Sequence, residues 1–473
     1  MTAPALWTVI PFATLLALIA LGPLFFGDWW GKHYPKVSIG LGIVVVAIYL
    51  THVGGGLRVA EVSGDYIRFL VLVGSLFVVA GGIHISVKGE ATPLANLGFL
   101  ALGALAANLI GTTGASMLLI RPWLRMNRYR VTGHHVVFFI FVVSNVGGAL
   151  TPIGDPPLYL GYLKGVPFWW VTAQLWPIWL VGVGILLAMF FVVDLRNYRR
   201  APKSVREKLA EPADHWRFEG LGNVALLAVV LGAAFIERPP FLREAIMVMA
   251  AIASYFTTGR QVHESNHFTF HPIKEVAILF AGIFATMMPA LDWLQASASK
   301  FGDPSAGLFF FGSGALSSVL DNAPTYLAFL SAAHGALVDP GLVTEVQRLA
   351  ALPGGPDLAA ASGPFAEAAK RSLAFIMQWH PAWLAHGKLG PEEIGVAHLL
   401  SDGFGRKIVA AISAGAVFFG ANTYIGNGPN FMVKAIADQQ KVHTPSFLAY
   451  VAKFTVPFMI PMLLVVWMIF FRH

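Results

Sequence analysis

Two short motifs hold the residues whose types and spacing are best suited to chemistry in this chain. TPIGDPP at 151–157 and TYIGNGP at 423–429 repeat the same Thr, Ile, Gly and Pro positions, and Asp155 in the first stands where Asn427 stands in the second. Each motif interrupts a long apolar stretch with Gly, Pro and a polar side chain. Paired interruptions in two halves of a membrane chain indicate a transport site, because unwound backbone there can bind small ions or substrates.

Two other apolar stretches are interrupted by polar residues, at GTTGAS (111–116) and at DNAP (321–324). The polar candidates around the four interruptions fall into two sets, one in each half of the chain. The first set is Asn108, Thr112, Thr113, Ser116, Thr151, Gly154 and Asp155, and the second is Ser317, Asp321, Asn322, Thr325, Asn422, Thr423, Gly426 and Asn427. Their oxygen ligands suit hard cations such as sodium, and the sequence predicts no transition-metal site.

Asp155 and Asp321 carry the most weight among these candidates. Placing a carboxylate at the centre of the membrane costs about 2.5 to 3.5 kcal/mol of insertion free energy. Such a group is therefore expected to have an interaction partner or a function. Burial favours the protonated carboxyl and a bound cation favours the carboxylate, so a proton and a metal ion can compete for one group. We interpret both residues as proton and cation coupling groups. The alternative is that each only caps the half-helix that follows it, ahead of Pro156 or Pro324.

The composition places the chain in a membrane. Hydrophobic residues make up 56% of the chain and charged residues 12%, against roughly 25% charged in soluble domains. The formal net charge of +7 lies in loops between apolar runs, which the positive-inside rule explains without a nucleic-acid partner. Because the chain has no cysteine and no GxxxxGK[ST] motif, neither thiolate metal sites nor ATP drive is expected. We predict no enzymatic activity and no cofactor.

Segment lengths predict an all-α polytopic membrane protein. A membrane-spanning helix needs about 20 predominantly apolar residues. This criterion predicts spans at 6–26, 37–53, 66–87, 134–163, 168–193, 220–236, 241–257, 273–291, 403–437 and 446–471. The stretches at 93–121 and 304–332 have polar, Gly-rich or Pro-containing centres that would leave backbone groups unpaired in lipid. We therefore assign these two as re-entrant hairpins.

Basic residues predict the orientation. Arg121, Arg125, Arg128 and Arg130 follow the first hairpin, and seven further Lys and Arg residues lie in the connector 194–219. If the hairpin enters and leaves on one face, both clusters lie on one side, which the positive-inside rule assigns to the cytoplasm. The chain is then a multi-pass protein of a bacterial-type inner membrane with both termini outside. His134 and His135, which begin a span on the cytoplasmic side, are expected at the interface.

The two halves repeat one plan. Residues 71–83 resemble 278–291 about a central glycine, and each segment is followed by a hairpin, a broken span and a closing span. With five spans and one hairpin per unit, the odd number of crossings inverts the second unit relative to the first. The units are 1–193, with its broken helix at 134–163, and 220–473, with its broken helix at 403–437 and an external insertion at about 335–400. We expect short amphipathic helices without a transport role in the insertion.

Three strings carry a resemblance to a known family. SNVGGALTPIGDPPLYLGYL (144–163), LDNAPTYLAFL (320–330) and GTTGASMLLIRPWLRMN (111–127) resemble the ion transporter superfamily, which includes bacterial D-type sodium/proton antiporters and citrate carriers. The resemblance implies a homodimer with a scaffold domain at the interface and a transport domain that contains the hairpins. Divalent-anion symporters of this superfamily carry Ser-Asn-Thr at each hairpin tip. The tips here read Gly-Thr-Thr and Asp-Asn-Ala, which places an acidic residue beside the second site.

The sequence therefore predicts a proton-coupled sodium or lithium antiporter that works by alternating access. Protons at Asp155 or Asp321 would exchange for a cation held by neighbouring hydroxyl and carbonyl oxygens. The alternative is a symporter for citrate or another carboxylate, driven by sodium or protons, with the amino ends of the half-helices holding the anion. The expected partners are membrane lipid and these small solutes.

Overall fold

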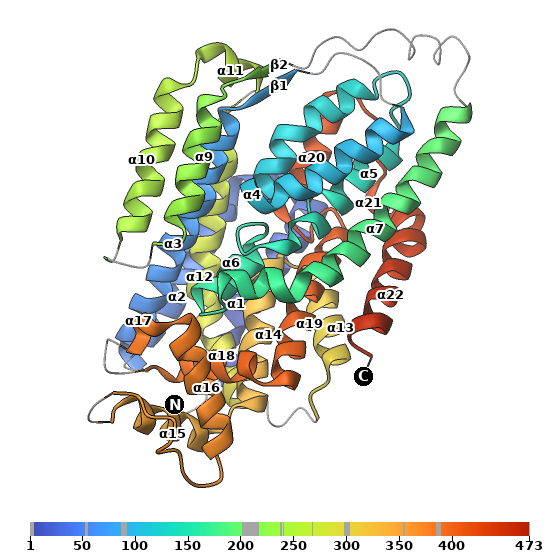
Figure 1. Cartoon of the computed structure of the whole chain (residues 1–473). Helices are drawn as coiled ribbons and strands as arrows, with labels where there is room; N and C mark the ends of the chain where they lie inside the picture. The colour runs from blue at the N-terminus through green and yellow to red at the C-terminus, as the bar shows by residue number, and fades with distance from the viewer. Residues whose placement is uncertain are drawn as a thin grey trace.

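The protein is an all-α polytopic membrane protein, as the sequence predicts. The computed structural model describes residues 4–52, 55–86, 92–200, 217–236, 239, 241–266, 268–297, 303–352, 355–384 and 389–472. Among these residues, nine helices are long and apolar enough to cross a membrane (Figure 1). The strands β1 (His84–Ser86) and β2 (Arg217–Glu219) pair antiparallel, with Ile85 opposite Phe218.

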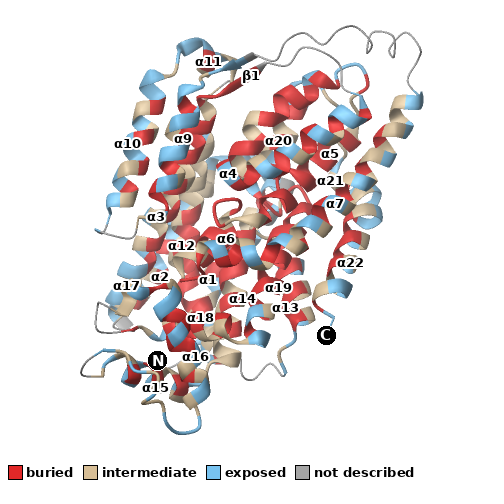
Figure 2. Ribbon diagram, in the orientation of Figure 1, coloured by how far each residue is buried: buried red, intermediate tan, exposed pale blue. Residues whose placement is uncertain are grey.

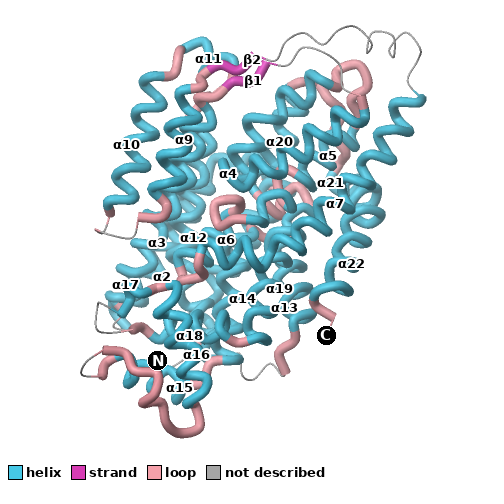
Figure 3. The backbone as a smooth tube through the Cα atoms, viewed as in Figure 1, coloured by secondary structure: helices cyan, strands magenta, loops and turns pink. Residues whose placement is uncertain are grey.

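Helices lie at every predicted span of the first half, although those at 27–52 and 56–81 begin earlier than the expected 37 and 66. They are η1 (Leu6–Val9), α1 (Ile10–Phe25), α2 (Gly27–His52), α3 (Gly56–Gly81), α4 (Pro93–Met126), α5 (Gly133–Val142), η2 (Val146–Leu150), α6 (Pro156–Leu163) and α7 (Phe168–Arg200). The predicted span at 134–163 is thus two short helices separated by irregular backbone and a 3-10 turn. The unwound segment lies inside the molecule, between α5 and α6 (Figure 3).

The second half contains a similar series of helices. They are α9 (Gly222–Ala233), α10 (Leu242–Thr257), α11 (Arg260–Ser265), α12 (His271–Ser297), α13 (Ala306–Ser317), α14 (Asn322–Leu337), α19 (Gly403–Phe419), η4 (Gly420–Asn422), α20 (Gly428–Gln439), α21 (Phe447–Tyr450), the π-helical η5 (Val451–Met459) and α22 (Ile460–Phe470). With 12 and 16 residues, α9 and α10 are shorter than the spans expected there. Both are also shorter than the roughly 20 residues of a full crossing.

Helix α4 folds back on itself at Gly111. A straight helix would place Asn96 and Asn127 roughly 46 Å apart, at 1.5 Å per residue. Instead their side-chain amides form two reciprocal hydrogen bonds of 2.8 and 3.0 Å. Gly111 has φ 75° and ψ 155°, a backbone conformation that residues with a Cβ rarely adopt. The first polar interruption is therefore the tip of a helical hairpin whose two ends lie together.

Helices α13 and α14 form the second helical hairpin. The rings of Phe309 and Phe329 meet edge to face at 6.1 Å, which holds the two arms side by side. The turn between the arms contains Asp321, whose carboxylate accepts a hydrogen bond from the Ala323 backbone N–H at 3.1 Å. Asp321 is therefore the N-cap of α14.

The corresponding segments 71–83 and 278–291 lie in α3 and α12, which pack against each other. Phe69 stacks on Phe280 with ring centroids 4.6 Å apart, and Phe284 lies beside both rings. Helices α2, α9 and α10 also pack on this pair (Figure 1). The broken helices and both hairpins make up the neighbouring part of the molecule, where burial is most complete (Figure 2).

The insertion at 335–400 forms four short helices at the end of the molecule opposite β1 and β2 (Figure 1). They are α15 (Pro340–Ala350), α16 (Ala366–Trp379), α17 (Pro381–Leu384) and α18 (Pro391–Ser401). Helices α15 and α16 each bury one apolar face, with Val346 and Ile376 fully covered, and leave polar residues outside. This pattern is that of the amphipathic helices expected from the sequence.

Candidate functional site

The carboxylate of Asp155 lies where both hairpins and both broken helices meet. It is 1% exposed and accepts hydrogen bonds from Thr112 Oγ1 at 2.6 Å, Asn322 Nδ2 at 2.6 Å and Asn427 Nδ2 at 3.2 Å. Thr112 belongs to the hairpin of the first half, whereas Asn322 and Asn427 belong to the hairpin and break of the second. The structure thus brings together in space four of the residues that the sequence predicts, and its Asn427–Asp155 hydrogen bond joins residues 272 positions apart.

The sequence around Asp155 explains why its carboxylate is free to face these donors. Asp155 occupies the N-cap position of α6, yet its side chain makes no capping bond. Pro156 and Pro157, the first two residues of the helix, have no backbone N–H to donate. The N–H of Leu158 bonds instead to the Asp155 carbonyl oxygen at 3.1 Å. Helix capping therefore does not explain why a carboxylate is present at position 155. Asp321, in contrast, does cap its helix.

The Asn427 amide links Asp155 to a second layer of polar residues that the sequence reasoning missed. Asn427 Nδ2 lies 3.2 Å from Asn145 Oδ1, and Asn145 Nδ2 donates to Asn430 Oδ1 at 2.6 Å. Ser144, next to Asn145, shares a 2.7 Å hydrogen bond with Ser116 of the first hairpin. In the sequence, these residues could have been recognised from Ser144 and Asn145, two adjacent polar residues within an otherwise apolar run.

The two breaks make equivalent contacts with the hairpins of their own halves. Thr151 Oγ1 donates to the Asn108 carbonyl oxygen at 2.7 Å, and Thr423 Oγ1 donates to that of Ser318 at 2.6 Å. The glycines of both motifs are required by close backbone packing. A Cβ on Gly154 would lie 2.0 Å from the carbonyl oxygen of Gly148, and a Cβ on Gly426 would lie 2.5 Å from that of Gly420.

Several other predicted residues support the backbone and do not touch Asp155. Asn108 donates to the carbonyls of Ala104 and Gly147 and accepts from the amides of Leu150 and Thr151. Ser317 donates to the Ala416 carbonyl, and Thr325 donates to the Asp321 carbonyl. Asn422 donates to the hydroxyl oxygen of Ser318. Thr113 is half-buried and is not a partner of Asp155.

Two side-chain oxygens near the hairpin tips are buried without a hydrogen-bond donor among the described residues. They are Oδ1 of Asn322 and Oδ1 of Asn422. Asn322 uses its nitrogen to bind Asp155, so its oxygen is held at fixed orientation beside the same carboxylate. Buried acceptors of this kind are the groups that a small cation can satisfy.

A second buried polar cluster lies at the opposite end of the first hairpin. The Asp194 carboxylate, in α7, pairs with the Arg130 guanidinium and accepts from Asn96 Nδ2 at 2.9 Å. His134 and His135, expected at the interface, are buried, with Nε2 atoms 3.4 and 3.1 Å from Asp194 Oδ1.

The contact between Arg130 and Asp194 places the loop after the first hairpin beside the start of the basic connector. The connector residues 201–216 lie outside the described residues.

The two imidazoles and the carboxylate of this cluster lie within 4.8 Å of one another, close enough to share a metal ion. The Asp194 carboxylate, however, is already occupied by Arg130 and Asn96. We therefore interpret the cluster as a structural ion pair that closes the base of the first hairpin.

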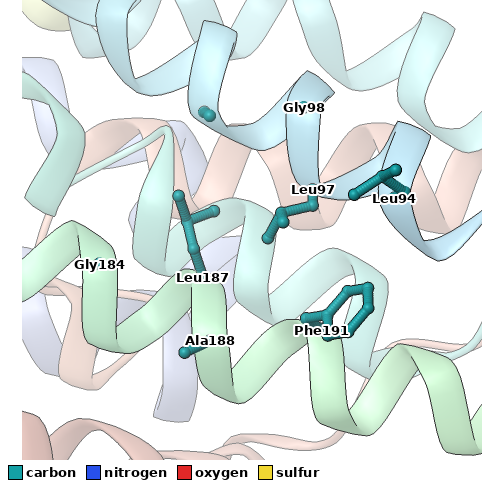
Figure 4. Close-up of a pocket in the computed structure, with 8 residues that line it drawn as sticks. Leu94, Leu97, Gly98, Gly184, Leu187, Ala188 and Phe191 are labelled. Atoms are coloured by element: carbon teal, nitrogen blue, oxygen red, sulfur yellow. The ribbon is translucent and has the colours of Figure 1, made fainter.

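An apolar groove of about 620 Å³ lies between α4 and α7 (Figure 4). Its walls include Leu94, Leu97, Leu187 and Phe191. None of the residues that bind Asp155 lines the groove, and its aliphatic and aromatic walls offer no ligand for an ion. The groove is therefore separate from the candidate site.

The comparison with known families covers nearly the whole chain. No curated protein matches the chain. A family model described as putative citrate transport matches residues 1–471, which include every residue of the site around Asp155. The likeness to sodium/proton antiporters stays a prediction. Since the matched region is far more than half of the sequence, the chain belongs to the family described as putative citrate transport.

Proposed function

We propose that this protein is a secondary active transporter in which Asp155 holds a proton or a metal cation in alternation. The observation that carries the proposal is the environment of the Asp155 carboxylate. It is buried, its hydrogen-bond partners among the described residues are neutral, and those partners come from both halves of the chain. An ionised carboxylate without counter-charge at this depth is costly, so the group needs a proton or a cation.

Sodium or lithium is the cation that fits the surrounding atoms best. Thr112 contributes a hydroxyl and Asn322 a buried oxygen without a donor among the described residues. Hard oxygen ligands of this kind suit alkali cations. When the cation leaves, a proton on Asp155 removes the charge, which couples the two fluxes in opposite directions. Asp321 is half-buried at the cap of α14 and has a secondary role in this proposal.

Symport of citrate or another carboxylate is the second candidate, and the family match favours it. Asp155 and Asn427 are the N-caps of α6 and α20, and Asn322 is the first residue of α14, so three helix amino ends lie together. Helix amino ends carry partial positive charge that stabilises anions. In this scheme the protonated Asp155 releases its amide and hydroxyl donors to a substrate carboxylate.

Transport by purified protein in liposomes that contain a pH-sensitive dye tests both candidates. A sodium or lithium pulse that changes the internal pH without carboxylate, while potassium does not, supports exchange. Uptake of radiolabelled citrate that needs a sodium or proton gradient supports symport, and a pH response seen only with citrate present points the same way. Flux that rises linearly with concentration without saturation contradicts both.

A further inference from the structure

Helix α3 carries two opposite charges on one face, at Arg58 and Asp65. Seven residues are close to two helical turns, so both side chains point in nearly the same direction. Arg58 pairs with Glu392 of α18 at 2.7 Å, and Asp65 pairs with Lys164, the residue after α6, at 2.9 Å. Lys164 also lies 3.5 Å from Glu392, which joins the two pairs into one network.

This network connects three parts of the chain that are far apart in sequence. Helix α3 packs with α12, and Asp292 of α12 also pairs with Arg58 at 3.0 Å. The hydroxyl of Tyr49, in α2, donates to the same aspartate at 2.7 Å. On the other side, Lys164 follows the half-helix that begins at Asp155. Glu392 belongs to the insertion, for which the sequence predicts no transport role.

The insertion also contacts the turn after α6 without using charge. His380 Nε2 donates to the Gly165 carbonyl oxygen at 2.9 Å. Trp383 stacks on His380 with ring centroids 3.8 Å apart, and its ring covers Gly165 so closely that a Cβ there would lie 2.5 Å away. Gly165 has φ 100°, which a residue with a Cβ rarely adopts. His380 and Trp383 of the insertion therefore hold the turn that ends α6.

Glu392 keeps its negative charge at neutral pH. Burial alone would raise the pKa of Glu392, but Lys164 and Arg58 outweigh it and hold the pKa of that carboxyl below its usual range. Arg58, Asp65, Asp292 and Lys164 are at most 18% exposed, so solvent screens their pairs less than it screens pairs on an open surface.

We propose that Asp65–Lys164 and Arg58–Glu392 form a latch through which the insertion and α3 hold α6, and with it Asp155, in the present conformation. The inference rests on the proposed function, because alternating access requires the elements that carry the site to move against their neighbours. Movement of α6 away from α3 breaks the Lys164 pairs, and the latch forms again when α6 returns. The insertion thus controls a conformational step of transport.

Spin labels test the latch without any transport assay. The chain has no cysteine, so Leu57→Cys on α3 and Met377→Cys on α16, both exposed, can be labelled selectively. Electron–electron resonance then reports the distance distribution between the two labels. We expect one narrow distribution that Lys164→Gln and Glu392→Gln broaden, whereas Lys164→Arg keeps it narrow. As a matched control, Lys370→Gln removes an exposed pair with Glu367 and leaves the distribution unchanged.

Cross-linking tests the link to transport. A short, reducible bifunctional thiol reagent joins Asp65→Cys to Lys164→Cys. Transport should then fall to the level of protein-free liposomes and return on reduction. The control pair Arg348→Cys and Ser362→Cys replaces two side chains that are in contact at 3.4 Å within the insertion, and it should transport normally when joined.

The two experiments separate the latch from the proposed function. An unchanged label distribution in Lys164→Gln overturns the latch, as does full transport with Asp65→Cys and Lys164→Cys completely joined. Absence of any sodium-, lithium- or citrate-dependent flux in the unmodified protein overturns the proposed function. In that case the label distances still decide whether Lys164 and Glu392 fix the position of the insertion relative to α3.

Discussion

Asp155 and Asp321 are chemically identical side chains that both precede a half-helix, yet their surroundings differ. The Asp321 carboxylate accepts a hydrogen bond from the backbone N–H of Ala323, the second residue of α14, whereas that of Asp155 binds three side chains from other elements. The difference follows from local sequence, since Pro156 and Pro157 provide no N–H while Ala323 does. At the residue scale this difference favours Asp155 over Asp321 as the coupling group that we propose.

Asp155→Asn should abolish coupled transport and leave the thermal midpoint nearly unchanged. The new amide can keep its oxygen toward Thr112 and Asn427, and Asn322 can turn its unpartnered oxygen toward the new nitrogen. Only the proton- and cation-binding charge is then lost. Liposome flux and thermal unfolding in detergent measure the two effects. Asp321→Asn is the matched control, because asparagine caps helices as well as aspartate does. Full coupled activity in Asp155→Asn would contradict the assignment.

Asp194→Asn should destabilise the protein by about 3 to 5 kcal/mol, because it leaves the buried Arg130 guanidinium without its counter-ion. Thermal or denaturant unfolding checks this loss. The control is Glu264→Gln, which breaks an exposed pair with Arg260 and should cost about 0 to 1 kcal/mol. Equal effects of the two substitutions would show that the Asp194 cluster contributes no more than a surface pair.

At the scale of single elements, the sequence predicted where helices form and break but not which long-range partners they find. Hydrophobic length and the Gly and Pro positions are local signals, so both hairpin tips and both breaks could be placed. Asn145 and Asn430 were missed because their contact joins residues 285 positions apart. The burial of His134 and His135 beside Asp194 was not predicted for the same reason, since Asp194 comes from another helix.

Pro157→Ala should weaken ion binding without harming the fold. It adds a backbone N–H at the second position of α6, where a cap residue accepts its hydrogen bond. The Asp155 carboxylate would then turn toward its own helix and away from Asn322 and Asn427. We expect a raised KM for the cation and an equal or higher thermal midpoint. Pro391→Ala is the control. It also adds a backbone N–H at the start of α18, but the N-cap residue there is Gly390, which has no side chain to accept a hydrogen bond from it. An unchanged KM in Pro157→Ala would refute this account.

At the scale of the whole molecule, the predicted orientation follows from the position of the basic clusters. Arg130 and Asp194 are in contact, so the loop after α4 and the end of α7 lie at one end of the molecule. The insertion lies at the other end (Figure 1). The distribution of basic residues in the sequence predicted that the loop after α4 and the end of α7 share one end of the molecule. No local sequence pattern predicted the contacts of the insertion with α3 and with the turn after α6.

Single cysteines and a membrane-impermeant maleimide test this orientation in intact cells. We expect Glu367→Cys, on the insertion, to be labelled directly. Tyr129→Cys and Arg199→Cys should be labelled only after the membrane is permeabilised, because the positive-inside rule places them in the cytoplasm. All three positions are exposed in the protein itself. Labelling of Tyr129→Cys and Glu367→Cys from the same side would refute the proposed topology.

The closure of the first hairpin by Asp194 has a consequence for biosynthesis. Asp194 is translated 64 residues after Arg130 and 98 residues after Asn96. A ribosome that has completed α4 has therefore not yet made the carboxylate that neutralises Arg130 and binds Asn96 of the first arm. The nascent hairpin must wait in an immature state until α7 emerges, so membrane insertion of this half is complete only when its last helix arrives.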